Sequence, residues 1–261
     1  MLHNKTLVLL AGGLGSRLGN LTESIPKPMV EIDNKPILYH IMSSFSKYGI
    51  DDFIIALGYK SEVIKDYFLK FKERNSNFTI NTKQGGIEFL DEVPNNWNVT
   101  LIDTGINTMT GGRVKRIEDY IKNEDDFIVT YGDGLCNVDI NELIKFHKSH
   151  GKIATVTAVR PTARFGELEV DKDQVKSFKE KPQTNKGRIN GGFFVFNKKF
   201  FEFIDDNDNV VLEADPLERV SDIGELMAFK HDGFWQCMDT PRDKDLLEKL
   251  SIESNKYPWL Q

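Results

Sequence analysis

Glycines and cations gather in two short segments near the start of the chain, and their spacing suits the binding of phosphate. An apolar run at residues 7–11 leads directly into a glycine-rich turn at residues 12–15, and Arg17 follows. Glycine lets the backbone approach a ligand without Cβ atoms in the way, so successive amide N–H groups can surround an anion. Lys27 lies between two prolines that restrict the backbone on either side of it. We therefore predict that the turn, Arg17 and Lys27 bind one negatively charged ligand.

The glycine turn departs from two well-known phosphate-binding fingerprints. No third spaced glycine follows Gly15, so G-x-G-x-x-G is not met, and the turn lacks the G-K-[ST] of a Walker A motif. A strand followed by a lone glycine turn is more often a tight connection than a binding loop. Because Arg17 and Lys27 accompany the turn, we favour anion binding over that interpretation.

Two aspartates follow short apolar segments farther along the chain. Asp133 comes shortly after the run at residues 127–131, between two glycines, and Asp239 follows residues 234–238. A carboxylate just beyond a buried strand suits Mg²⁺, which prefers oxygen ligands and shares its shell with phosphate oxygens. An Asp-Gly pair is more often only a turn, and Asp239 could instead cap a helix that begins near Pro241. We predict that Asp133 binds metal, and Asp239 is the candidate second carboxylate.

Residues 104–116 form a second loop, rich in hydroxyls, glycines and cations. It lies between an expected strand at residues 99–103 and an expected helix, which is where an α/β sheet binds its ligands. Taken alone, Thr110 could simply cap that helix while Arg113 remains in solvent. Because this is a second glycine-containing loop at a strand end, we predict that it lines the same pocket as the first, on the opposite side.

Polar residues in the second half of the chain suit a sugar phosphate. Glu180 and Lys181 end an alternating segment, and Asn190 and Gly191 stand at the mouth of an apolar strand. Carboxylate and amide groups can bind sugar hydroxyls, and lysine can bind phosphate. The competing interpretations are a surface charge pair for the first two residues and a hairpin turn for the others.

The elements that would position these residues alternate between strand and helix. That order predicts an α/β fold with a Rossmann-like, mixed and mostly parallel sheet flanked by helices, and alternating segments at residues 165–170 and 175–180 add a smaller antiparallel part. Residues 74–98 are irregular and predict a partly extended excursion, with subunit contact as one interpretation. We expect the main strands at residues 7–10, 53–57, 99–103, 127–131, 154–159, 189–196, 226–230 and 234–238 and helices at residues 36–47, 140–150 and 216–222, with others beginning near residues 61 and 241.

Length, charge and cysteine content narrow the class of protein further. The 261 residues suit one domain, and the net charge of −6 disfavours a general nucleic-acid-binding surface. Cys136 and Cys237 are the two cysteines, so a reducing cytoplasm is the expected compartment. His147 and His150 lack a third ligand type and are not expected to bind zinc. No stretch approaches the roughly 20 apolar residues that span a bilayer, so we expect no membrane segment.

Beyond these physical arguments, the chain resembles the sugar-1-phosphate nucleotidylyltransferases. The resemblance begins with Leu10-Ala11-Gly12-Gly13-Leu14-Gly15-Ser16-Arg17-Leu18 and Pro26-Lys27-Pro28-Met29, and it runs nearly end to end. The loop at residues 104–116 resembles the branch of that family that uses CTP and glucose 1-phosphate. The other matching segments are residues 131–134, 144–148, 164–166, 180–182, 189–195, 224–229 and 238–240.

This resemblance implies a reaction between CTP and α-D-glucose 1-phosphate that gives CDP-glucose and pyrophosphate, with Mg²⁺ as cofactor. It implies a single domain, residues 1–261, in which residues 1–150 mainly bind nucleotide and residues 151–261 mainly bind the sugar phosphate. It also implies a homo-oligomer that supplies CDP-linked deoxysugars for surface polysaccharide. Two alternatives stay open: a cytidylyltransferase for another phosphorylated acceptor, and a regulator that binds CTP without turnover.

The resemblance also assigns roles to individual residues. The catalytic residues would be Arg17, Lys27 and Asp133, and the metal ligands would be Asp133 and Asp239. The sugar-phosphate side would consist of Glu180, Lys181, Asn190 and Gly191. The nucleotide site would consist of Leu10, Ala11, Gly12, Gly13, Leu14, Gly15, Ser16, Arg17, Lys27, Thr108, Gly111, Arg113 and Gly132.

Overall fold

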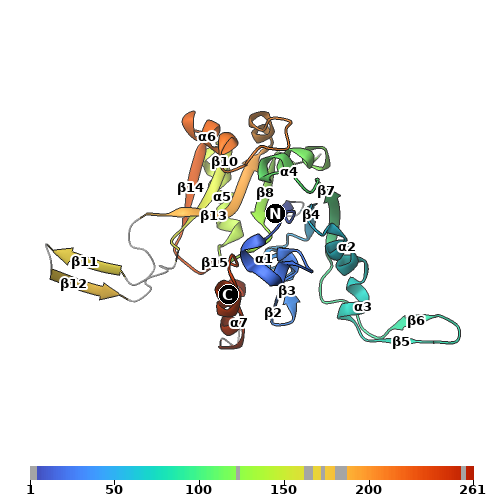
Figure 1. Ribbon diagram of the computed structural model, residues 1–261. Coiled ribbons are helices and arrows are strands. Elements are labelled where there is room, and N and C mark those ends of the chain that lie inside the picture. Colours follow the sequence, from blue (N-terminus) through green and yellow to red (C-terminus); the bar gives the residue numbers. More distant parts are fainter. Residues whose placement is uncertain (1–4, 122–123, 162–166, 172–173, 180–186, 254–256) are drawn as a thin grey trace.

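A twisted seven-stranded sheet runs through the middle of the molecule (Figure 1). The computed structural model describes residues 5–121, 124–161, 167–171, 174–179, 187–253 and 257–261. Neighbouring strands are parallel except that β13 is antiparallel to both β8 and β10. This confirms the predicted mixed, mostly parallel sheet. In spatial order the strands are β14 (Leu226–His231), β10 (Ala154–Val159), β13 (Ile189–Asn197), β8 (Asp126–Tyr131), β1 (Thr6–Leu10), β4 (Asp52–Leu57) and β7 (Asn98–Asp103).

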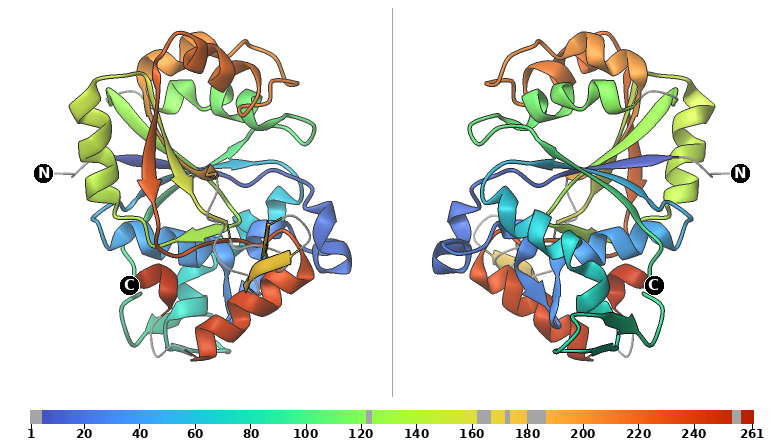
Figure 2. Two further views of the ribbon diagram at one scale, coloured as in Figure 1. Left: turned by 90° about the vertical axis from the view of Figure 1, so that its left-hand side faces the viewer. Right: turned by 90° about the vertical axis from the view of Figure 1, so that its right-hand side faces the viewer.

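Helices cover both faces of the sheet, as the two views in Figure 2 show. Leu7 and Leu9 of β1 belong to the core on the face of α1, α5 and α7, whereas Val8 and Leu10 belong to the core under α4 and α6. Burial on both faces explains why β1 is an uninterrupted apolar run. The helices are α1 (Ile37–Ser46), α2 (Ser61–Leu69), α3 (Phe71–Asn75), α4 (Thr110–Arg116), α5 (Ile140–His150), α6 (Asp215–Asp222) and α7 (Pro241–Glu253).

Helix α5 illustrates why local signals predicted the elements well. It occupies the expected residues 140–150, its N-cap Asp139 accepts a hydrogen bond from Glu142 N, and Gly151 ends it in the left-handed conformation.

Across the part of the chain that the structure describes, no helix combines the length and the apolar character that crossing a membrane requires.

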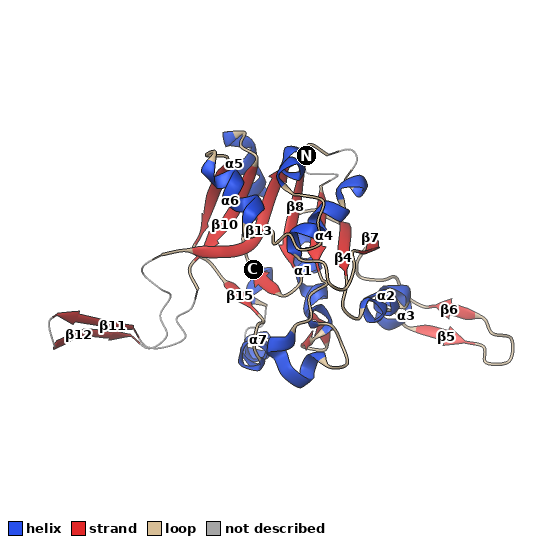
Figure 3. Ribbon diagram, turned by 45° about the horizontal axis from the view of Figure 1, so that its top comes forward, coloured by secondary structure: helices blue, strands red, loops and turns tan. Residues whose placement is uncertain are grey.

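Two antiparallel hairpins project from opposite sides of the molecule (Figures 1 and 3). One pairs β5 (Phe78–Ile80) with β6 (Ile87–Phe89), within the segment expected to leave the sheet as a partly extended excursion. The other pairs β11 (Glu167–Asp171) with β12 (Gln174–Lys179), which confirms the antiparallel part predicted there. The division of labour between residues 1–150 and 151–261 stays a prediction.

A second, smaller pairing determines where the site lies. Strand β15 (Trp235–Cys237) was expected as another apolar strand, and it pairs with β9 (Gly134–Cys136) as a separate antiparallel ribbon. Two further short strands, β2 (Glu31–Ile32) and β3 (Lys35–Pro36), pair with each other before α1.

Aromatic packing behind β13 provides a test of the core. The Phe196 side chain is fully buried, and its ring centroid lies 3.9 Å from that of Phe200 and 5.3 Å from that of Phe194. We expect Phe196→Ala to lower the free energy of unfolding by about 3–5 kcal/mol, because the cavity cannot close fully. Leu69→Ala, at a side chain that is 77% exposed, should change it by less than about 0.5 kcal/mol. Urea denaturation followed by circular dichroism measures both, and equal losses would contradict the described core.

Candidate active site

The loops that follow β1, β7 and β8 meet at one edge of the sheet, because parallel neighbouring strands place their carboxyl ends together. They enclose a cavity of about 530 Å³. Every residue predicted for the nucleotide site except Gly111 lines it. Seven further residues line it: the predicted metal ligand Asp133, four more residues of the second predicted loop, and Pro28 and Tyr131, which had no predicted role. The lining comprises Leu10, Ala11, Gly12, Gly13, Leu14, Gly15, Ser16, Arg17, Lys27, Pro28, Ile106, Asn107, Thr108, Met109, Thr110, Arg113, Tyr131, Gly132 and Asp133.

Gly15 explains how the glycine turn and Lys27 come to lie against each other. Its φ of 65° is left-handed, and a Cβ there would lie 2.9 Å from Lys27 Cβ. Lys27 itself opens a short 3-10 turn, Lys27–Met29, which follows the extended Pro26. A side chain at position 15 would therefore push Lys27 away from the turn, so the glycine is needed for both backbone conformation and packing.

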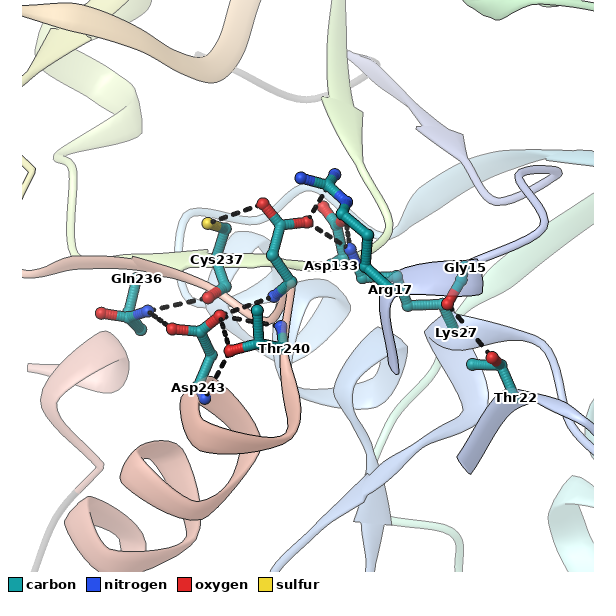
Figure 4. Close-up of polar contacts among 10 residues, drawn as sticks. Gly15, Arg17, Thr22, Lys27, Asp133, Gln236, Cys237, Thr240 and Asp243 are labelled. Carbon is teal, nitrogen blue, oxygen red and sulfur yellow. Dashed lines mark hydrogen bonds and ion pairs between the residues drawn. The ribbon is translucent and has the colours of Figure 1, made fainter. Parts of the chain in front are cut away.

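Four charged residues converge beside this cavity, and we call Arg17, Lys27, Asp133 and Asp239 the charge cluster (Figure 4). Lys27 Nζ donates to Asp133 Oδ2 at 2.5 Å and to Asp239 Oδ1 at 2.7 Å. Arg17 Nη2 lies 2.8 Å from Asp239 Oδ1. The structure thus brings together in one place the three residues on which the predicted chemistry depends, Lys27, Asp133 and Asp239.

Burial and charge compete in setting the proton affinities of this cluster. Burial alone would lower the pKa of Lys27, but its ion pairs with Asp133 and Asp239 outweigh burial and raise that pKa. Burial would likewise raise the pKa of Asp239, yet the hydrogen bond and charge of Lys27, together with Arg17, hold it below its usual value. Both side chains are therefore charged at neutral pH.

The ribbon of β9 and β15 places the two carboxylates side by side. Cys237 pairs with Gly134, and Met238 N donates to the backbone oxygen of Asp133 at 2.9 Å. Asp239 is the next residue after Met238, so its backbone lies beside that of Asp133, across the ribbon. The sequence had left open whether Asp239 caps a helix, and in the structure its carboxylate contacts Lys27 and Arg17.

The carboxylates of Asp133 and Asp239 supply the oxygen donors that Mg²⁺ prefers. Within the described ranges, no group of three or more His, Cys, Asp or Glu side chains is placed to hold a metal ion. Two carboxylates are nevertheless what Mg²⁺ commonly takes from a protein when phosphate and water complete its shell. Burial, followed by the charges of Asp239, Asp133 and Asp243, raises the pKa of the nearby Cys237 thiol to about 12.

Arg113 supports the wall of the cavity through its guanidinium. Only 4% of the residue is exposed, and burial, followed by the charge of Arg116, lowers its pKa. Its Nη2 donates to Gly12 O at 2.9 Å, and its Nη1 donates to Leu57 O at 2.9 Å and to Gly105 O at 2.8 Å. The side chain therefore ties the glycine turn to the end of β4 and to the loop after β7. Its predicted contact with a nucleotide stays a prediction.

Two residues of the second predicted loop differ in position: Thr108 lines the cavity and Gly111 does not. Gly111 lies outside the cavity lining, its amide donates to Val210 O at 2.9 Å, and a Cβ there would lie 2.6 Å from Val210 Cγ1. Thr108 is buried and lines the cavity. The glycine thus allows close packing of α4 against residues 207–212, and Thr108 remains the candidate contact.

The sugar-phosphate residues are only partly covered by the structure. Glu180 and Lys181 lie outside the described residues. Asn190 and Gly191 open β13, outside the cavity lining, with Asn190 Oδ1 accepting from Gly192 N at 2.8 Å.

Tyr131 and Glu213 are the notable residues that sequence reasoning missed. The Tyr131 hydroxyl donates to Glu213, and Thr110 Oγ1 donates to Glu213 Oε2 at 2.7 Å. Tyr131 directly precedes Gly132 at the end of a predicted strand, and that position alone could have identified it as a candidate site residue. Glu213 lies in an irregular segment before α6 and carried no signal.

The chain belongs to the nucleotidyl transferase family, whose model matches residues 6–248. Within that family it is 51% identical to a glucose-1-phosphate cytidylyltransferase of Salmonella typhi, over 97% of each chain. It is 42% identical to a probable glucose-1-phosphate cytidylyltransferase of Bacillus subtilis, over 92% of this chain and 93% of the other. The crystal structure of HddC from Yersinia pseudotuberculosis has a TM-score of 0.70 and 30% identity, and covers 94% of this chain and 99% of its own.

The Arg113 contacts predict a large loss of stability when the guanidinium is removed. Arg113→Met removes charge-assisted hydrogen bonds to the carbonyl oxygens of Gly12, Leu57 and Gly105, each worth about 1.5–3 kcal/mol. Gly12 O and Leu57 O keep Tyr59 N and Thr104 N as donors. We expect the free energy of unfolding to fall by about 3 kcal/mol or more in urea titrations. Arg219→Met is the matched control, because Arg219 is 42% exposed in its side chain and its carboxylate contacts measure 3.4 Å. A similar, small loss in both variants would contradict the supporting role of Arg113.

Proposed function

We propose that this protein transfers the cytidylyl group of CTP to α-D-glucose 1-phosphate and releases pyrophosphate. The observation that carries the enzyme class is the shared contact of Lys27 with Asp133 and Asp239 beside the cavity. The choice of CTP and glucose 1-phosphate is supported by the name of the Salmonella typhi relative, which matches over 97% of each chain. A cavity of about 530 Å³ is also large enough for a small-molecule substrate.

The glycine turn and Arg17 hold the triphosphate in this proposal. Backbone N–H groups at residues 12–15 supply fixed donors, and the Arg17 side chain is 69% exposed, so it can turn from Asp239 to a phosphate. Lys27 is mostly buried and contacts both aspartates, which suits an ammonium group that stays near the reacting phosphorus. In the reaction the sugar-phosphate oxygen attacks the α-phosphorus in line as pyrophosphate leaves.

Alignment and charge neutralisation account for the catalysis without a covalent nucleophile. Lys27 exchanges carboxylate contacts for phosphate contacts when substrate enters, which offsets the negative charge that the reacting phosphates bring together. Asp133 and Asp239 would hold Mg²⁺, which when bound would neutralise phosphate oxygens of the triphosphate. Thr108 is the candidate contact from the loop after β7, and Glu180, Lys181, Asn190 and Gly191 are the candidate contacts to glucose 1-phosphate.

We expect the protein to act in the cytoplasm as a homo-oligomer. The hairpin of β5 and β6 supports contact between copies, because it projects from the sheet and carries exposed apolar side chains. Ile80 and Ile87 are 52% and 48% exposed.

The double variant Ile80→Ser/Ile87→Ser should lower the mass of the particle toward that of one chain, because it removes apolar area from the contact. Leu69→Ser, at a 77% exposed position on α2, is the control. Light scattering coupled to size-exclusion chromatography measures the mass. An unchanged mass in the double variant would contradict a contact through this hairpin.

The proposed reaction predicts severe losses when the charge cluster is broken. Lys27→Ala and Asp133→Ala should each lower kcat/KM by two powers of ten or more, which corresponds to about 3 kcal/mol of transition-state stabilisation. Lys145→Ala is the control, because that side chain is 74% exposed on α5. Pyrophosphate release measures all three.

The same assay identifies the substrates. Four nucleoside triphosphates, each combined with several hexose 1-phosphates in the presence and absence of Mg²⁺, should show turnover with CTP and glucose 1-phosphate when Mg²⁺ is present. A different preferred sugar phosphate would favour the alternative acceptor, and CTP binding without pyrophosphate release would favour a regulator. Near-normal turnover in Lys27→Ala and Asp133→Ala would refute the assigned roles.

A further inference from the structure

The backbone of Asp239 is held on its N-terminal side by Met238, which is fully buried in the core and whose amide donates to Asp133 O at 2.9 Å. Asp239 follows β15, a strand of three residues in a separate two-stranded ribbon. Its carboxylate is oriented by Lys27 and Arg17 and by the Cys237 thiol, whose Sγ lies 3.6 Å from Oδ2. In the proposed reaction both cations turn toward phosphate, so the two ion pairs that orient Asp239 are weakened when the carboxylate is needed.

The Asp243 side chain holds the backbone of the turn that follows β15. The Asp243 carboxylate accepts hydrogen bonds from Asp239 N at 3.1 Å, from Thr240 N at 2.8 Å and from Thr240 Oγ1 at 2.8 Å, all at Oδ2. Its other oxygen accepts from Gln236 Nε2 at 3.2 Å. Figure 4 shows these contacts converging on Asp243 from the end of β15 and the start of α7.

These contacts exceed what a helix cap requires. The pair of Thr240 and Asp243 forms a reciprocal capping box, in which Asp243 N also donates to Thr240 Oγ1 at 3.3 Å. A cap satisfies the first N–H groups of the helix, whereas Asp243 reaches back to the amide of Asp239 itself. Helix α7 is in turn anchored by Leu247, which is fully buried in the core. On its C-terminal side, where Met238 does not hold it, the Asp239 backbone is therefore tied to the core through Asp243 and α7.

We propose that Asp243 is a positioning residue that holds the Asp239 carboxylate in place for a divalent cation while Lys27 and Arg17 turn to substrate. This inference rests on the proposed function for the exchange of partners. Asp243 lies outside the cavity lining, so it acts through Asp239. Groups that orient a metal ligand commonly change metal affinity by about 10–100-fold when they are removed.

The test measures metal binding directly. Mn²⁺ is titrated into the full-length protein in the presence of CTP and without a sugar phosphate, and free Mn²⁺ is followed by electron paramagnetic resonance. We expect Asp243→Asn to raise the Kd of Mn²⁺ by about tenfold or more. Asp243→Glu keeps the charge and can still reach the same amides, so it should restore most of the affinity.

The control is Asp139→Ala, which removes the N-cap of α5. It should lower the melting temperature and leave the Kd of Mn²⁺ unchanged. If Asp243→Asn does not fold, Thr240→Val takes its place, because it removes one hydrogen bond to the Asp243 carboxylate and must also raise the Kd. Unchanged Mn²⁺ binding in the Asp243 variant, or an equal effect of Asp139→Ala, would overturn the positioning role.

The outcome is distinguishable from a failure of the proposed function. Wild-type protein that forms no CDP-glucose from CTP and glucose 1-phosphate would refute the proposed reaction. The contrast in Mn²⁺ affinity between Asp243→Asn and Asp243→Glu tests the positioning role by itself, since no turnover enters that measurement.

Discussion

Two carboxylates that converge on one ammonium group repel each other, and much of this structure serves to hold them together. The Asp133 and Asp239 side chains share Lys27 Nζ at 2.5 and 2.7 Å. Lys27 can occupy that position because Gly15 leaves room for it, and Asp239 can because β15 pairs with β9. The cluster therefore depends on contacts between segments that are far apart in the chain, and a change in any of them would separate the charges.

The balance of charges explains how such a site can exchange one partner for another. A lysine that bridges two carboxylates is stabilised by ion pairs, and a triphosphate with a divalent cation offers each of these groups an equivalent partner. Neither ammonium nor carboxylate then has to be buried without a counterion, which would be costly. In the proposed reaction this arrangement would be in place before the substrates bind, which favours in-line transfer between phosphates.

Caps, apolar spacing and turn residues predicted the helices and strands, and the expected order of strands in the sheet predicted part of the site. The helix at residues 140–150 was found because its cap, its apolar spacing and its terminal glycine are all local. Asp133 could be placed at the sheet edge because it directly follows a buried strand. The burial of Arg113 could not be predicted in this way, since its partners are carbonyl oxygens at the ends of β1, β4 and the loop after β7. A basic residue in a polar loop is more often in solvent, and only its packing revealed otherwise.

The sequence by itself determined the fold class, the edge of the sheet that carries the site, and the types of charged residue that meet in the charge cluster. These follow from periodicities and turn residues, whose physical causes act within a few neighbours along the chain. The tertiary structure alone decided that Asp239 joins Lys27 rather than capping a helix, that Gly111 packs against Val210, and that Tyr131 reaches Glu213. Each of these depends on long-range pairing, which no local pattern specifies, because the partners become neighbours only when the sheet and its ribbon have formed.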